Sequence, residues 1–134
     1  MNPYYMLDTN IVSDAIRNPD GRAAQKIDQN ADMGLAMSII TAAELRFGAA
    51  KKGSPRLLAR VEDALRMIPP LPFDVPADSE YAGIRAELEA AGKPIGPNDL
   101  FIAAHAYSLG MTLITATTSE FSRIRGLRLE NWLT

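Results

Sequence analysis

Three carboxylic acids lie at positions from which a folded chain could bring them together: Asp8, Glu44 and Asp99. Two carboxylates about 6 Å apart repel each other by about 3 kcal/mol at an effective dielectric of about 20. Three such pairs would cost several kcal/mol, which is comparable to the stability of a whole domain. Clustered acids therefore require a cation or must stay protonated, and oxygen ligands favour Mg²⁺, with Mn²⁺ as a substitute. Such an ion activates water and stabilises charge on a phosphodiester.

Each acid also has a purely structural interpretation. Asp8 could cap the helix that follows it, and Thr41 with Glu44 matches a capping box. Asp99 could be a favourable charge at a helix N-terminus, worth about 0.3–1 kcal/mol. These interpretations do not explain why the sequence after Asp99, Leu100–Ala104, is so apolar. An acid that begins such a helix is expected to point toward a buried or half-buried place.

The elements that must position these acids alternate between strands and helices. Strands are predicted near 4–7, 33–38, 71–73, 111–115 and 126–129, and helices near 9–17, 22–29, 41–50, 55–68, 77–91 and 98–109. The strands are apolar throughout, which is typical of a parallel sheet covered on both faces. The sequence therefore predicts an α/β fold.

Open parallel sheets bind ligands beyond the carboxyl ends of their strands. Asp8 comes directly after the first predicted strand, and Glu44 is expected in the first turn of the helix after the second. Both acids are thus expected at this edge of the sheet. Asp99 precedes its strand instead of following one, so its position at the same edge is a hypothesis.

The overall composition limits the kind of protein this can be. The 134 residues suit a single domain, 1–134, with 47% hydrophobic and 22% charged residues. The formal charge of -2 offers no electrostatic argument for nucleic-acid binding. The absence of cysteine excludes disulfides, zinc–cysteine sites and cysteine nucleophiles, and the single histidine leaves no second histidine for a zinc site. No signal peptide and no run of roughly 18 apolar residues is present, so a cytoplasmic location without a membrane span is expected.

Four stretches together make the chain resemble the PIN-domain family, specifically the VapC-like ribonuclease toxins. They are Met6–Ile11, Ser38–Gly48, Ile95–Ala104, and Glu120–Arg123 with Gly126–Trp132. The resemblance covers nearly the full length and implies a three-layer α/β/α sandwich around a central parallel sheet. It also implies Mg²⁺-dependent cleavage of RNA, often of tRNA, by the toxin of a toxin–antitoxin pair. A homodimer and a small antitoxin that blocks the acidic groove are further expectations.

The resemblance assigns catalytic roles to Asp8, Glu44 and Asp99, all three as metal ligands. The family often has Asp or Asn at the position that aligns with Thr117. A hydroxyl is a poorer metal ligand than a carboxylate, so Thr117 is assigned a supporting catalytic role, and a second metal ion and full activity are open questions. Glu120 belongs to the matched Glu-Phe pair and is not expected to replace the missing acid.

Other polar residues near these positions have two interpretations each. Asn10 and Asn98 could orient the acids, or they could cap helices. Ser38 could lie near the metal or bond only to backbone. His105 is six residues beyond Asp99 on another face of its helix and is not expected to be catalytic, and Trp132 is interpreted as a core anchor. Five basic residues could contact phosphates, although a solvated helix face explains them nearly as well: Arg46, Lys51, Lys52, Arg56 and Arg60.

Three other functions remain open at this point. A phosphatase could use Asp8 as its nucleophile, but the haloacid-dehalogenase pattern has a second Asp where this chain has Asn10. A catalytically weakened PIN-like module could bind RNA or antitoxin without cutting. A DNA nuclease also remains open, because no feature of the sequence recognises a 2′-hydroxyl.

Overall fold

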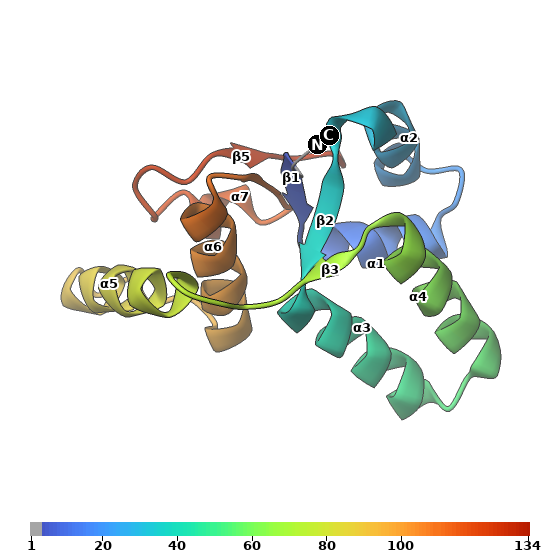
Figure 1. Cartoon of the computed structure of the whole chain (residues 1–134), viewed down its shortest axis with the longest axis horizontal. Helices are drawn as coiled ribbons and strands as arrows, with labels where there is room; N and C mark the ends of the chain where they lie inside the picture. Colours follow the sequence, from blue (N-terminus) through green and yellow to red (C-terminus); the bar gives the residue numbers. More distant parts are fainter. Residues whose placement is uncertain (1–3) are drawn as a thin grey trace.

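The computed structural model describes residues 4–134 and contains a central sheet flanked by helices (Figure 1). Its strands are β1 (Tyr5–Leu7), β2 (Leu35–Ser38), β3 (Pro70–Leu71), β4 (Thr112–Ile114) and β5 (Leu129–Glu130). The strand order is β3-β2-β1-β4-β5, and every pairing is parallel. The predicted parallel sheet is confirmed, although its last strand starts at Leu129, later than the predicted start at 126.

The first six helices lie close to the predicted segments, and the seventh, a short helix near the C-terminus, was not predicted. The helices are α1 (Thr9–Arg17), α2 (Arg22–Gln29), α3 (Ile39–Lys52), α4 (Pro55–Met67), α5 (Ala77–Ala90), α6 (Pro97–Leu109) and α7 (Thr118–Phe121), with a 3₁₀ turn η1 at Ala31–Met33. Gly53 and Gly110 end α3 and α6 in the left-handed conformation, at φ 61° and 67°, which glycine adopts without a steric penalty. Among residues 4–134, no helix is long and apolar enough to cross a membrane.

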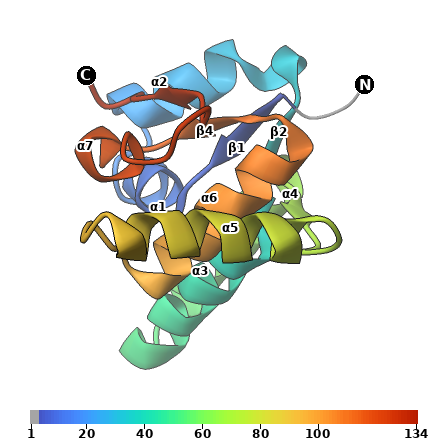
Figure 2. The same cartoon turned by 90° about the vertical axis from the view of Figure 1, so that its left-hand side faces the viewer.

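Helices cover both faces of the sheet, because successive strand residues point to opposite sides. Leu7, Met37 and Ile114 pack in one core with apolar residues of α1, α2 and α4. Met6, Ala36 and Leu113 pack in a second core with α6 and the start of the C-terminal segment. Figures 1 and 2 show the sheet between these two groups of helices. The three-layer α/β/α sandwich is confirmed.

The parallel topology also decides where α6 begins. Only Gly110 and Met111 separate α6 from β4, so the chain reverses direction between the helix and the strand. The N-terminus of α6 therefore lies at the edge of the sheet where the strands end, and α1 and α3 begin at this same edge. The start of α6, with Asp99, thus meets the residues that follow β1 and β2.

Candidate active site

Asp8 is fixed by its backbone and by a neighbouring strand. It caps α1, where its Oδ1 accepts a hydrogen bond from the backbone N–H of Ile11 at 3.2 Å. Pairing of β1 with β4 places Leu7 opposite Ile114, so that the Thr115 hydroxyl donates to Oδ2 of Asp8 at 2.5 Å. Asp8 is only 3% exposed, and burial raises the pKa of this carboxyl while the Thr115 hydroxyl opposes the rise. Asp8 can therefore cap α1 and belong to the acidic site at the same time.

Thr117 reaches Asp8 only through Thr115. The Thr115 oxygen accepts the backbone N–H of Thr117 at 3.1 Å and lies 3.0 Å from the Thr117 hydroxyl. Because the Thr115 proton is donated to Asp8, the Thr117 hydroxyl must donate to Thr115. Thr117 thus supports the hydroxyl that holds Asp8. Thr115 itself was missed from the sequence, because a Thr at the end of a strand carries no local signal of a partner 107 positions away.

Replacing Thr115 with Val should destabilise the chain by about 1.5–3 kcal/mol at neutral pH, the usual value of a hydrogen bond to a charged group. Val keeps the shape of Thr but cannot donate to the buried Asp8 carboxylate. Urea unfolding at pH 7.5 without divalent cations measures this change. Thr112→Val is the matched control, because Thr112 is also buried in this strand and makes no described hydrogen bond to a carboxylate. Equal losses in the two variants would contradict the role of Thr115.

Glu44 lies in the second turn of α3, because the helix begins at Ile39 and not at Thr41. Ser38 caps this helix, its hydroxyl oxygen accepting the N–H of Ile40 at 3.1 Å. The capping-box interpretation of Thr41 with Glu44 is therefore wrong, and so is the expected first-turn position. The Glu44 side chain is free to point across the edge of the sheet.

Two side chains from other helices hold the Glu44 carboxylate. Thr9, at the start of α1, donates to Oε1 at 2.5 Å. Asn98, at the start of α6, donates to Oε2 at 3.1 Å. Asn98 therefore orients Glu44 and not its own neighbour Asp99. The beginnings of α1 and α6 are joined at Glu44, as the sheet topology requires.

Asp99 lies in the first turn of α6, within the electrostatic field of three other acids. Burial, followed by the charges of Glu120, Asp8 and Glu44, raises the pKa of Asp99 to about 6. Glu120 has the largest effect of the three, although sequence reasoning had set it aside. Its Oε1 accepts the backbone N–H of Gly96 at 3.3 Å, so the loop before α6 holds it near Asp99. The matched Glu-Phe pair marked Glu120 in the sequence, but its effect on Asp99 carried no local signal, because its position depends on the loop that precedes α6.

The acids are neighbours, but they do not form a closed metal shell. Within residues 4–134, no three of the acidic or histidine side chains lie close enough together to enclose an ion. The expectation that the three acids meet in one pocket is therefore corrected: they are neighbours at one edge of the sheet, but they do not enclose an ion-sized space. Asp8 and Glu44 are each held by their own donors, and mutual repulsion opposes closer approach. The donor set still suits a hard divalent cation, because carboxylate oxygens retain unused lone pairs and a cation would relieve the repulsion at Asp99.

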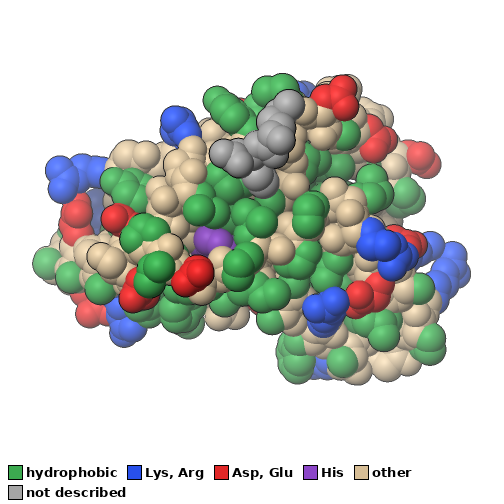
Figure 3. Space-filling view, in the orientation of Figure 1, with side chains coloured by type: hydrophobic (Ala, Val, Ile, Leu, Met, Phe, Trp, Pro, Cys, Tyr) green, Lys and Arg blue, Asp and Glu red, His purple; other side chains and the backbone are tan. Residues whose placement is uncertain are grey.

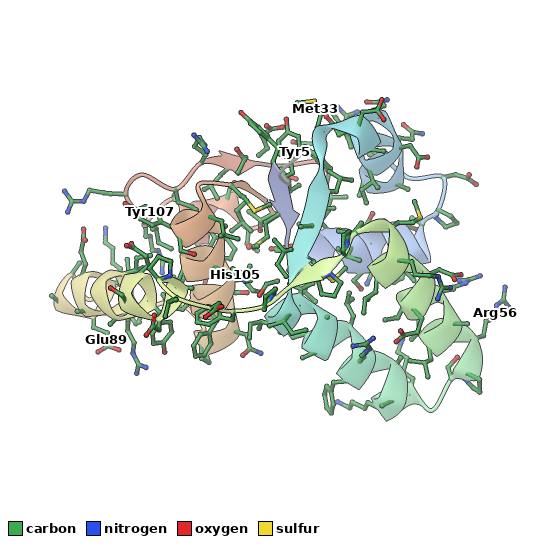
Figure 4. The ribbon with its side chains drawn as sticks, viewed as in Figure 1. Tyr5, Met33, Arg56, Glu89, His105 and Tyr107 are labelled. Atoms are coloured by element: carbon green, nitrogen blue, oxygen red, sulfur yellow. The ribbon has the colours of Figure 1, made fainter. Side chains whose placement is uncertain are left out.

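His105 and Trp132 have structural roles. His105 is 1% exposed, its Nδ1 lies 2.9 Å from the Ser38 hydroxyl, and its ring packs edge-on against Phe73 (Figure 4). Burial lowers the pKa of His105, so the ring is neutral at physiological pH. Trp132 is buried against Tyr5 in the first core, as expected of a core anchor. Ser38 therefore bonds to His105 and to backbone.

Known proteins with similar sequences are ribonucleases. The PIN domain model matches residues 5–127. Ribonuclease VapC2 of Haemophilus influenzae is 42% identical over 130 residues, which span 96% of this chain and 98% of the relative. The tRNA(fMet)-specific endonuclease VapC of Shigella flexneri is 40% identical over 129 residues, covering 96% and 97% of the two chains.

Solved structures agree with the sequence comparison. The crystal structure of DNA-bound VapBC from Salmonella typhimurium matches with a TM-score of 0.91 and 38% identity, over 97% of this chain and 98% of that one. VapBC2 from Rickettsia felis, bound to a DNA fragment from its promoter, matches with a TM-score of 0.90 and 35% identity, over 96% and 98%. These matches extend over nearly all of the fold described above. The chain belongs to the PIN-domain family, among the VapC ribonucleases.

Proposed function

We propose that this chain is a divalent-metal-dependent endoribonuclease that acts as the toxin of a toxin–antitoxin pair. The observation that carries the proposal is the meeting of Asp8, Glu44 and Asp99 at the carboxyl edge of the sheet, with their charges coupled at Asp99. An RNA phosphodiester is negatively charged and would be repelled by these acids alone. A site of this kind therefore suits RNA cleavage only with a cation.

In this proposal Asp8, Glu44 and Asp99 hold Mg²⁺, for which Mn²⁺ is a substitute. The ion supplies charge neutralisation and Lewis acidity toward the phosphodiester. Thr115 opposes the rise in the pKa of Asp8 that burial causes, and Thr117 orients Thr115. Thr9 and Asn98 fix the direction of the Glu44 carboxylate. Glu120 is a fourth acid beside Asp99, and it provides the negative charge that Thr117 lacks.

The test is cleavage of RNA by the purified chain with Mg²⁺ and with EDTA. Cleavage that requires the cation is expected. Mg²⁺ binding by calorimetry without cleavage of any RNA would contradict the proposal and favour the catalytically weakened binding module. Cleavage of a DNA strand at the same rate as RNA of the same sequence would instead favour a general nuclease. A tRNA is the first substrate to test, because the Shigella flexneri relative is named for tRNA(fMet).

We also propose that a small antitoxin binds this chain and blocks the acidic edge. The support is the VapBC complexes of the relatives and an apolar groove on the surface. Six apolar side chains from α1, α2, α4 and the residue that caps α4 line much of this groove: Val12, Ala15, Ile16, Ile27, Met67 and Ile68. Met67 is 65% exposed there, which is costly for an apolar side chain that has no partner. An apolar segment of the antitoxin would cover it.

Replacing Met67 with Asp should weaken antitoxin binding on the order of a hundredfold, because the variant places a charge in the apolar contact. Calorimetry with the antitoxin encoded beside this chain measures the change. The control is Val75→Asp, because Val75 is 76% exposed and lies outside the groove. Unchanged binding in the Met67 variant would place the antitoxin on another surface.

A homodimer and a cytoplasmic site of action complete the proposal. Apolar side chains are spread over the face shown in Figure 3, and exposed Ile39 is one of the large apolar residues that a second copy could cover. Sedimentation equilibrium would detect the dimer, and a monomer at all accessible concentrations would contradict it. The cytoplasmic location follows from the proposed RNA substrate.

A further inference from the structure

The hairpin of α3 and α4 carries a basic excess that the rest of the chain lacks. We refer to residues 39–68 as the arm, which projects away from the sheet in Figures 1 and 2. The arm contains six Lys and Arg against three Asp and Glu, whereas the remainder contains eight against thirteen. The formal charge of -2 for the whole chain therefore conceals a segregation of charge. A basic arm beside an acidic site suggests contact with a polyanion.

The structure distinguishes among the five basic residues that the sequence offered as phosphate contacts. Arg46 is already paired with Glu62 through two hydrogen bonds of 2.9 and 3.0 Å. Arg60 lines the apolar groove between α1, α2 and α4. Arg56 points outward from α4, away from α3 (Figure 4). Lys51 and Lys52 remain, both exposed at the end of α3 and without an ion pair among the described residues.

Lys51 continues the line along α3 that starts at Glu44, and Lys52, one residue further, lies about 80° from that line around the helix axis. Seven residues make almost two helical turns, so Lys51 lies within about 20° of Glu44 around the helix axis. At about 1.5 Å per residue, the two lysines are on the order of 10–12 Å beyond Glu44. Successive phosphates of one strand in a nucleic-acid duplex advance by about 3.4 Å. The lysines would thus reach phosphates on the order of three nucleotides from a bond held at the acids.

Gly48 lies between Glu44 and the lysines, one turn after Glu44. Apart from its two chain neighbours and the backbone of its own helix turns, a Cβ added to Gly48 would meet no atom of residues 4–134 within 4 Å. Neither packing within the chain nor a positive φ therefore requires glycine here. Glycine inside a helix costs roughly 1 kcal/mol relative to alanine. Nothing inside the chain requires glycine at position 48, which lies on the face that leads to the acids. This indicates that a molecule outside the chain approaches the helix closely there.

We infer that this face of α3, from Glu44 past Gly48 to Lys51 and Lys52, is a track for the phosphate backbone of the RNA substrate. The inference rests on the proposed ribonuclease function and names the surface that holds the strand on one side of the cut. RNA accounts for both features, because it is a polyanion that must pass the acids and it needs clearance at Gly48. The exposed ring of Phe47, 67% accessible beside Gly48, provides a surface on which a base can stack.

The first test uses RNA binding and its salt dependence, in an Asp99→Asn background that leaves the RNA uncut. Fluorescence anisotropy compares Lys51→Ala/Lys52→Ala with Lys26→Ala/Arg56→Ala, which removes the same charge away from the track. Loss of two phosphate contacts on a single strand should reduce the slope of log K against log salt by about 1.4 and weaken binding on the order of tenfold at 0.1 M salt. The control pair should change neither quantity. Equal slopes in both double variants would overturn the inference.

The second test fills the track without changing charge. Gly48→Gln should raise the thermal unfolding midpoint, because glutamine favours the helix and meets open space, yet it should weaken RNA binding severalfold. Gly48→Ala should raise the midpoint with a smaller loss of binding. Unchanged RNA binding in Gly48→Gln would overturn the inference. The inference would also be overturned if Gly48→Gln changed dimer or antitoxin affinity in place of RNA binding, because this face of α3 would then be a protein interface.

These outcomes separate the track from the proposed function. If the wild-type chain cleaves RNA with Mg²⁺ while the lysine variants bind RNA normally, only the track is wrong. If the wild-type chain neither binds nor cleaves RNA, the ribonuclease function fails and the track fails with it.

Discussion

RNA cleavage is expected to fall at least a hundredfold when Asp99 is replaced by Asn, and to a similar extent when Asp8 is. Removing one group that stabilises charge in a transition state typically costs between a hundredfold and a thousandfold in rate. Asn keeps the shape of Asp but has no charge and only one oxygen for a cation. Measurement of kcat/KM on RNA with Mg²⁺ tests both variants. Glu120→Gln should give a smaller loss in the same assay.

Asp99→Asn is the cleaner of the two substitutions. Both Asp8 oxygens accept hydrogen bonds, from the Ile11 N–H and the Thr115 hydroxyl, so an amide at position 8 must place its NH₂ against one of these donors. Burial and neighbouring negative charges raise the pKa of Asp99, which means that its charge is unfavourable in the folded chain. Without a metal, the Asp99→Asn variant should therefore be as stable as the wild-type chain or more stable. Circular dichroism and urea unfolding verify folding. Asp28→Asn on α2 is the control, and wild-type cleavage by the Asp99 variant would contradict the site assignment.

Divalent cations should stabilise the chain, and more strongly at pH 7.5 than at pH 5. At a hundred times its Kd, a ligand that binds only the folded state adds about 2.7 kcal/mol, which corresponds to a rise in Tm on the order of 10 °C. The pKa of Asp99 is about 6, so at pH 5 a proton competes for this carboxylate and Mg²⁺ affinity should be about tenfold lower. The same Mg²⁺ concentration should then raise Tm by about half as much. Thermal unfolding with Mg²⁺ and with EDTA measures both shifts.

Without a divalent cation, the contribution of Asp99 to the stability of the chain should fall as the pH rises. The pKa of Asp99 is raised from 3.8 to about 6, so the folded state binds more protons than the unfolded state between these values. The stability that Asp99 contributes is therefore present below about pH 4 and is lost as the pH rises through 6. Asp99→Asn should abolish this dependence and most of the Mg²⁺ effect. Equal Mg²⁺ stabilisation at both pH values would contradict the role of Asp99 as a ligand.

The order of elements and the position of Asp8 could be predicted from the sequence. Strands and helices follow from short apolar runs and helical spacing, which are local patterns. Asp8 is next to its strand in the sequence, so its place at the carboxyl edge followed directly. For Asp99 the sequence supported only a hypothesis; its place at this edge follows from the structure, in which α6 runs back against β4. The matched stretches identified the family, because they occur in the same order over nearly the full length.

The groups that hold the acids could not be predicted from the sequence, because they come from distant segments that meet in the folded chain. Glu44 looked like half of a capping box until the helix was found to begin one turn earlier, after Ser38. Thr115 reaches Asp8 across 107 positions and Asn98 reaches Glu44 across 54, through strand register and the meeting of two helix ends. Glu120 acts on Asp99 because the loop before α6 holds it there. Such contacts depend on packing between distant segments, which no local pattern of residues encodes.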